Sequence, residues 1–154
     1  MLVTKVSPEN WRRIRKRVLT FVANHKDRHL TPETSARLRS LRSDVLSEDG
    51  SMVLLATEQN RLLGVLACKE YGRYFSLAVV RRSERSKGVG KQLLRSAISE
   101  LGEFHVEIAS DNVPSLKLAF ACGLTAHSVF LRDTGKVVLR LKIESHQLPA
   151  ASRD

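Results

Sequence analysis

The fold of this chain is decided by residues 79–98, which read VVRRSERSKGVGKQLLRSAI. An apolar run leads through Gly88 and Gly90 into an amphipathic helical pattern, and six basic side chains surround the turn. The first backbone N–H groups of a helix have no intrahelical partner, and glycine lets an oxygen approach them without meeting a Cβ. The pattern therefore predicts an anion site, although a tight strand-to-helix turn without a ligand fits the glycines equally well.

Length and composition narrow the class of protein. The chain has 154 residues, 42% hydrophobic and 27% charged, which predicts one globular domain. Its formal net charge of +10 favours an anionic partner such as a nucleic acid, a membrane surface or a phosphorylated small molecule. No apolar run is long enough to span a bilayer, and no secretory signal is visible. Together with the isolated Cys68 and Cys122, this predicts a cytoplasmic protein.

Periodicity predicts the order β-α-α-β-β-β-α-β-α-β-β, an α/β domain with a mixed sheet and helices on its faces. Two details of this prediction can be tested directly. The second helix is expected to run from Pro32 through Leu38, Leu41, Val45 and Leu46 to Ser47. In the last strand, one buried face is expected at Val137, Leu139, Leu141 and Ile143. The domain is expected to cover residues 1–144, and residues 145–154 read as a loose tail.

Two familiar phosphate-binding loops do not fit the glycine turn. A P-loop, G-x-x-x-x-G-K-[ST], would need glycine where Arg85 stands and Ser or Thr where Gln92 stands. A dinucleotide-binding G-x-G-x-x-G would need a third glycine at Leu93. Both alternatives are therefore excluded.

The spacing Arg85-x-x-Gly88-x-Gly90 after a strand ending at Val80 resembles the central signature of the GNAT superfamily of acyl-CoA-dependent N-acyltransferases. A second stretch, VEIASDNVPSLKLAFACGL, is similar to another signature of that family. Its matching positions are Glu107, Asn112, Ser115 and Gly123. The expected order of elements also agrees with the family over almost the whole chain.

The resemblance implies a binding site for acetyl-CoA. The loop after Arg85 would hold the pyrophosphate with backbone N–H groups, and the end of the preceding strand would pair with the pantetheine arm. Asn112 would hydrogen-bond the arm from the other side, and it can also serve as a plain helix cap. The implied cofactor-binding residues are Ala78, Val79, Val80, Arg85, Ser86, Lys87, Gly88, Val89, Gly90, Lys91 and Asn112.

The resemblance also implies a catalytic residue and shows one departure. Glu107 occupies the position of a catalytic glutamate in some members, and it could equally be a solvated residue or one paired with an arginine. The tyrosine that commonly protonates the departing thiolate is replaced by Ala119. Tyr71, Tyr74 or Ser115 could substitute, and the sequence prefers none of them.

The function expected from these residues is N-acetyl transfer from acetyl-CoA to a primary amine of a small molecule or peptide, by direct transfer. The alternative is a GNAT-fold module that binds acyl-CoA with little or no catalysis. We expect neither a membrane nor a metal partner, and a homodimer is left open. Nucleic acid is not expected because aromatic residues make up only 5% of the chain. The first helix carries a basic cluster that is interpreted as a solvated face. Its members are Arg12, Arg13, Arg15, Lys16 and Arg17.

Overall fold

The computed structural model describes residues 1–144, whose strands form two antiparallel sheets instead of one mixed sheet. The first sheet has the order β1-β2-β3-β4 and the second has the order β5-β7-β6, so β4 and β5 are both edge strands. The expected order of elements is confirmed, and the predicted tail at 145–154 lies outside the described residues. The elements are β1 (Leu2–Lys5), α1 (Pro8–His25), α2 (Pro32–Arg39), β2 (Met52–Glu58), β3 (Arg61–Lys69), β4 (Phe75–Val80), α3 (Val89–Leu101), β5 (Phe104–Ala109), α4 (Val113–Ala121), β6 (Thr125–Leu131) and β7 (Val137–Ile143).

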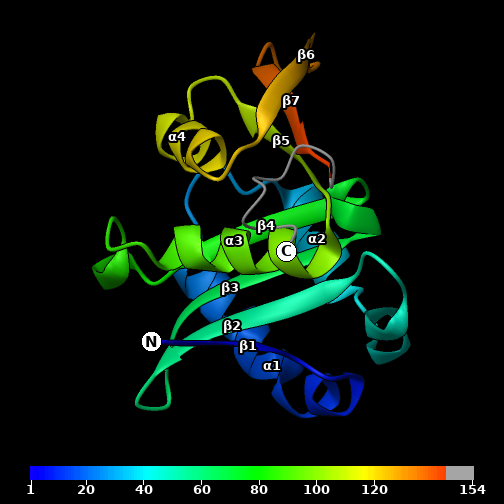
Figure 1. Cartoon of the computed structure of the whole chain (residues 1–154), viewed down its shortest axis with the longest axis vertical. Coiled ribbons are helices and arrows are strands. Elements are labelled where there is room, and N and C mark those ends of the chain that lie inside the picture. Colours follow the sequence, from blue (N-terminus) through cyan, green and yellow to red (C-terminus); the bar gives the residue numbers. More distant parts are fainter. Residues whose placement is uncertain (145–154) are drawn as a thin grey trace.

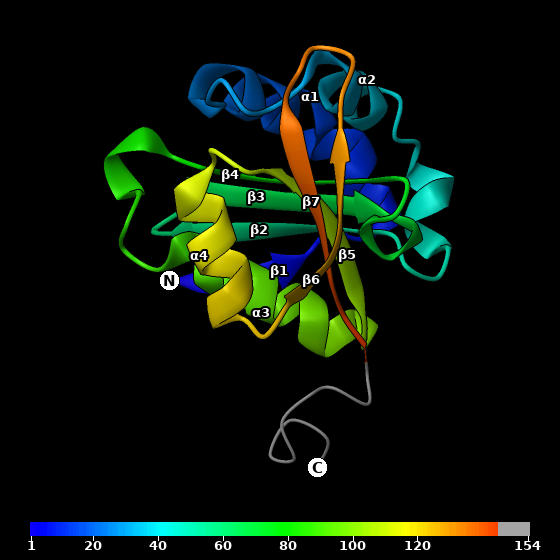
Figure 2. The same cartoon turned by 90° about the horizontal axis from the view of Figure 1, so that it is seen from above.

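Helices cover both faces of the first sheet. Figure 2 shows α1 and α2 on one side of this sheet and α3 on the other. Side chains of β2 and β3 alternate between the two cores: Val53 and Val65 pack toward α1, whereas Leu54 and Leu66 pack toward α3. Because both faces are buried, these strands read as continuous apolar runs in the sequence.

The pairs Ser7-Pro8 and Thr31-Pro32 each predict the start of a helix, and both N-terminal helices begin there. The Ser7 hydroxyl accepts a hydrogen bond from the Asn10 N–H at 3.2 Å, and the Thr31 hydroxyl accepts one from the Thr34 N–H at 3.2 Å. Each cap is followed by a proline at the first helical position, where its missing N–H costs no hydrogen bond. Local capping chemistry thus sets both helix starts.

The prediction that the second helix continues to Ser47 is wrong. α2 ends at Arg39, and a separate 3₁₀ helix follows at Ser43–Ser47. Two carbonyl groups at this break accept hydrogen bonds from side chains of α1. The Trp11 indole N–H donates to Leu41 O at 3.0 Å, and Arg15 donates to Arg39 O. The apolar residues Leu38, Leu41 and Leu46 are still buried in the core, although they lie in separate segments and not in one helix.

The buried face predicted for the last strand holds only in part. Leu141 and Ile143 are buried and Leu139 packs against the same core, as expected. Val137, beside the hairpin turn, is 40% exposed, whereas Val138 is fully buried. Val138 lies in the central strand of its sheet, opposite Ala109 of β5 and Phe130 of β6, and its burial departs from the predicted alternation at the start of β7.

One glycine fits tightly between the two sheets. Gly72 lies in a short 3₁₀ turn before β4 and has a φ of 91°, a region that favours glycine. A Cβ built on Gly72 would lie 2.0 Å from the carbonyl oxygen of His105 in β5. This close approach sets the spacing between the two sheets at one end of β4.

Candidate active site

A cleft of about 890 Å³ lies where β4 and β5 separate. Within residues 1–144, no ladder of hydrogen bonds joins these two strands, so the β4 backbone facing β5 has no strand partner. Figure 1 shows the second sheet and α4 standing above α3 and the first sheet. The walls come from the α1–α2 link, β4, the glycine turn, β5 and the start of α4.

The cleft brings together the residues that the sequence analysis singled out. Every predicted cofactor-binding residue lines it except Lys87, and Glu107 lines it as well. The Lys87 ammonium instead lies 3.4 Å from a carboxylate oxygen of Glu84. The residues come from segments as far apart as Ala78 and Asn112, so only the folded chain assembles them.

The glycine turn leaves the start of α3 open. Gly88 is the N-cap residue, with a φ of 90°, and no side chain caps the helix. A Cβ built on Gly88 would meet no atom within 4 Å. The uncapped N–H groups and the helix dipole therefore face open space on the cleft, an arrangement that suits a phosphate group.

Arg85 holds the glycine turn in place. Its guanidinium donates to the carbonyl of His25 and, at 3.3 Å, to that of Val80. These bonds tie the turn to the end of α1 and to the end of β4. Arg85 therefore fixes the position of the glycine turn relative to α1 and β4.

His25 is a cleft residue that the sequence analysis did not select. Its Nδ1 accepts a hydrogen bond from the Arg82 N–H at 3.3 Å. Burial, and then the nearby Arg81, Arg82 and Arg85, lower the pKa of His25 below its ordinary value. In the sequence, His25 stands only in a polar link between two predicted helices. That position does not show whether a residue lines a cleft or lies on the open surface.

We expect His25 to make stability depend on pH. Because its pKa is lowered in the folded state, the unfolded chain binds more protons as pH falls below about 6.5. The free energy of unfolding should therefore fall as pH drops from 7 to 5, and His25→Gln should flatten this slope. Urea titrations at several pH values would measure the free energy of unfolding and its dependence on pH. The control is His127→Gln, at an exposed position of β6. An unchanged slope in His25→Gln contradicts the prediction.

Glu107 lies between two arginines. One carboxylate oxygen is 3.1 Å from Arg140 Nε, and the other is 3.9 Å from a terminal nitrogen of Arg132. The side chain is 46% exposed and lines the cleft. Its surroundings match the ion-paired alternative from the sequence analysis, and any proton transfer to this carboxylate competes with those ion pairs.

The start of α4 forms the opposite wall. Asn112 caps the helix, since its side-chain oxygen accepts from the Ser115 N–H at 3.4 Å. Ala119 and Ser115 both line the cleft, so the position of the missing tyrosine does face it. Of the three proposed substitutes only Ser115 lies there, because Tyr71 and Tyr74 are not among the lining residues.

The α1–α2 link closes onto the end of β5 through Asp111. Its carboxylate lies 2.7 Å from the Lys136 ammonium, 3.8 Å from His29 Nδ1 and 3.9 Å from Arg28. The hydrogen bond from Lys136 is the main cause of the lowered pKa of Asp111. His29 is a second lining residue that the sequence analysis passed over.

The described residues contain neither a candidate metal site nor a candidate membrane span. In residues 1–144, no group of three or more His, Cys, Asp or Glu side chains could hold a metal ion. No helix of that part of the chain is long and apolar enough to cross a membrane.

Comparisons with known proteins agree on one family. Residues 7–115 match the family model described as the acetyltransferase (GNAT) domain. No curated protein sequence matches the chain. Among solved structures, the Salmonella typhimurium protein YncA, solved with its cofactor acetyl-CoA, has a TM-score of 0.71 at 17% identity and covers 97% of this chain and 96% of its own.

Two further structures have the same fold. A GNAT-family acetyltransferase from Streptococcus pneumoniae has a TM-score of 0.71 at 13% identity, covering 92% of this chain and 97% of its own. A spermidine N-acetyltransferase from Vibrio cholerae has a TM-score of 0.66 at 15% identity, covering 99% of both chains. At these identities the likeness concerns the fold, and the family model covers more than half of the sequence. The chain belongs to the GNAT acetyltransferase family.

Proposed function

We propose that this protein transfers the acetyl group of acetyl-CoA directly to a primary amine. The observation that carries the proposal is the cleft between β4 and β5, which runs from the uncapped start of α3 to the carboxylate of Glu107. Its volume of about 890 Å³ lies in the range of sites for small molecules and cofactors. The site thus has room for an extended ligand with an anionic end.

The backbone provides most of the cofactor contacts in this proposal. The N–H groups at the start of α3 hold the pyrophosphate, and Gly88 keeps their approach free of a side chain. The unpaired edge of β4 at 78–80 bonds the amides of the pantetheine arm in the manner of an added strand. Asn112 remains a helix cap and directs the rest of its amide group to the arm.

The chemical step needs an acceptor amine in its neutral form. Bound acetyl-CoA supplies a thioester whose carbonyl carbon is attacked by the amine nitrogen, while the C–S bond breaks and CoA leaves as a thiolate. Glu107 is the proposed base that accepts the amine proton, directly or through a water molecule. Ser115 is the hydroxyl on the cleft wall that can hydrogen-bond the thiolate and relay to it a proton from water, in place of the tyrosine replaced by Ala119.

The carboxylates that line the cleft limit how much positive charge an acceptor can carry. The acids that line it are Asp27, Glu84, Glu107 and Asp111. The last three form ion pairs with Lys or Arg side chains, and Asp27 accepts a hydrogen bond from the His29 N–H at 2.8 Å. A polycation would find few carboxylates without a partner here. Although a structural neighbour is a spermidine N-acetyltransferase, we propose an acceptor with a single amine.

The test is acceptor-dependent release of CoA from acetyl-CoA, followed with a thiol reagent across a panel of monoamines, amino-terminal peptides and spermidine. We expect a monoamine or peptide to be the best acceptor and Glu107→Gln to slow its acetylation roughly 100-fold, the low end of what a general base contributes. Glu103→Gln is the matched control, since Glu103 precedes β5 but does not line the cleft.

The outcomes separate the two candidate functions. Normal turnover in Glu107→Gln would contradict the assigned base. If acetyl-CoA binds but no amine in the panel releases CoA, the protein is instead an acyl-CoA-binding module. Ala119 in the cleft wall and the ion pairs of Glu107 are the observations that favour this second function.

A further inference from the structure

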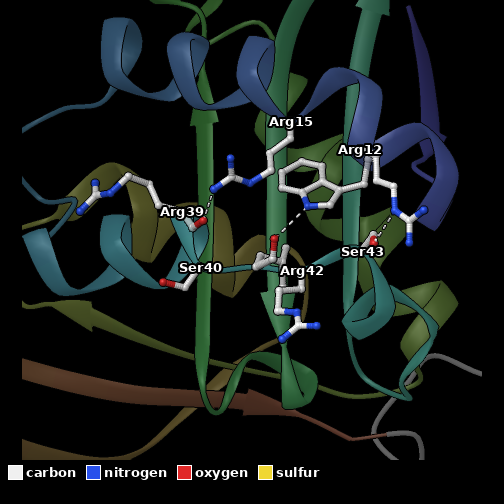
Figure 3. A pocket seen from close by; sticks show the side chains of 8 residues that line it. Arg12, Arg15, Arg39, Ser40, Arg42 and Ser43 are labelled. Carbon is white, nitrogen blue, oxygen red and sulfur yellow. Dashed lines mark hydrogen bonds between the residues drawn. The ribbon is translucent and has the colours of Figure 1, made fainter.

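A second hollow lies between the first half of α1 and the segment that follows α2. Its volume is about 410 Å³, and it shares no lining residue with the acetyl-CoA cleft. Figure 3 shows the side chains that line it, with Arg12 and Arg15 on α1 and Arg39 and Arg42 on the opposite segment. Four arginines therefore surround one small concave site.

The positive charge of this hollow is poorly compensated. Arg42 lies 3.5 Å from a carboxylate oxygen of Asp44, at the edge of the site. In the part of the chain that the structure describes, Arg12, Arg15 and Arg39 form no ion pair. Because these positive charges line one hollow with a single carboxylate at its edge, an anion that enters the hollow gains their attraction.

Two backbone oxygens in the wall of the hollow already accept hydrogen bonds from side chains of α1. The Trp11 indole donates to Leu41 O at 3.0 Å, and Arg15 donates to Arg39 O. Arg12 uses its Nε to bond the Ser43 hydroxyl at 3.0 Å. Each guanidinium carries five N–H donors, so most of them remain available to a ligand. The hydrogen bonds thus fix Arg12 and Arg15 while leaving donors that match phosphate oxygens.

The placement of the arginines indicates the type of anion. In Figure 3, Arg39 extends to one side of the hollow, Arg12 to the other, and Arg42 lies between them. One phosphate group carries at most about two negative charges, fewer than the three guanidinium groups without an ion pair, so a chain of phosphates matches the charge of the hollow better. A single-stranded nucleic acid fits less well, because Trp11 is 1% exposed and offers no ring for base stacking.

We propose that this hollow is a binding site for a small oligophosphate-bearing molecule, separate from the acetyl-CoA cleft. The guanidinium groups of Arg12, Arg15, Arg39 and Arg42 together bind the phosphate chain. The hydroxyl groups of Ser40 and Ser43 lie on the same wall and can add hydrogen bonds.

The experiment is titration calorimetry with inorganic tripolyphosphate, in proteins that all carry Gly88→Glu, whose side chain fills the space at the start of α3 and so keeps phosphate out of the cleft. The site variant is Arg39→Glu/Arg42→Glu, and the control is Arg13→Glu/Lys16→Glu. Both variants change the formal charge equally and alter exposed side chains, but Arg13 and Lys16 do not line the hollow. We expect the site variant to bind at least tenfold more weakly than the parent and the control less than threefold. Arg39→Gln/Arg42→Gln, with no new negative charge, should show the same ranking.

Each other outcome has a definite meaning. Equal weakening in the site and control variants would overturn the proposal, because general surface charge would then explain binding. Absence of tripolyphosphate binding to the parent would overturn it as well. A second titration with ATP that shows the same ranking supports a nucleoside polyphosphate as the ligand. A 20-nucleotide RNA that binds more tightly than tripolyphosphate and is weakened equally by both variants would overturn it in favour of a nucleic-acid surface.

Discussion

Gly88→Glu should abolish measurable binding of acetyl-CoA, a loss of at least about 100-fold in affinity, because a carboxylate in the phosphate cradle costs several kcal/mol. The new side chain starts where a Cβ meets no protein atom within 4 Å, so it enters the space left for the pyrophosphate. It also places a negative charge beside the uncapped N–H groups of α3. Calorimetric titration of acetyl-CoA into parent and variant measures the effect.

The matched control is Gly135→Glu in the β6–β7 turn. Gly135 has a φ of 88°, and a Cβ there also meets nothing within 4 Å, so both variants carry the same backbone strain. Gly135 is not among the residues that line the cleft. Retained affinity in Gly88→Glu would contradict the assigned cradle, and a parallel loss in Gly135→Glu would show that strain, and not the ligand site, was responsible.

Gly72→Ala should give the largest loss of stability, about 3 kcal/mol, from left-handed strain and overpacking together. The added Cβ would lie 2.0 Å from the His105 carbonyl oxygen, and a backbone atom in a paired strand cannot move aside cheaply. For a chain of this size the midpoint of thermal unfolding should fall by roughly 6–12 °C. Because the contact joins the two sheets, the cleft between β4 and β5 should also be disturbed.

Gly135→Ala separates the two contributions to this loss. Its φ of 88° matches the 91° of Gly72, but no atom lies within 4 Å of its Cβ. It should therefore cost only about 1 kcal/mol, the strain alone. Urea or thermal unfolding of both variants gives the difference, and equal losses would show that the approach to His105 is not a tight contact.

The sequence predicted the parts of the fold that depend on neighbouring residues. The caps at Ser7 and Thr31, the glycine turn before α3 and the order of the elements follow from capping, periodicity and turn chemistry, which act over a few residues. The end of α2 could not be predicted in this way. It depends on hydrogen bonds from Trp11 and Arg15, which lie at least 24 residues away in the chain.

The candidate site shows the same division. The motif around Gly88 and Gly90 pointed to the GNAT family, because a phosphate cradle at the start of a helix is a local structure. The partners of Glu107 could not be read from the sequence, since Arg140 is 33 residues away and reaches it across the β5–β7 ladder. His25 lines the cleft because the end of α1 lies beside the glycine turn, which is a long-range contact.

The sequence by itself thus indicated the family, the succession of helices and strands, and the segment that we propose as the phosphate cradle. Only the tertiary structure shows that Lys87 pairs with Glu84 and does not line the cleft, that Glu107 lies between arginines, and that four arginines of two distant segments surround one hollow. The physical reason is the range of the interactions. Backbone conformation follows from adjacent residues, whereas ion pairs and cavities depend on which surfaces the folded core brings together.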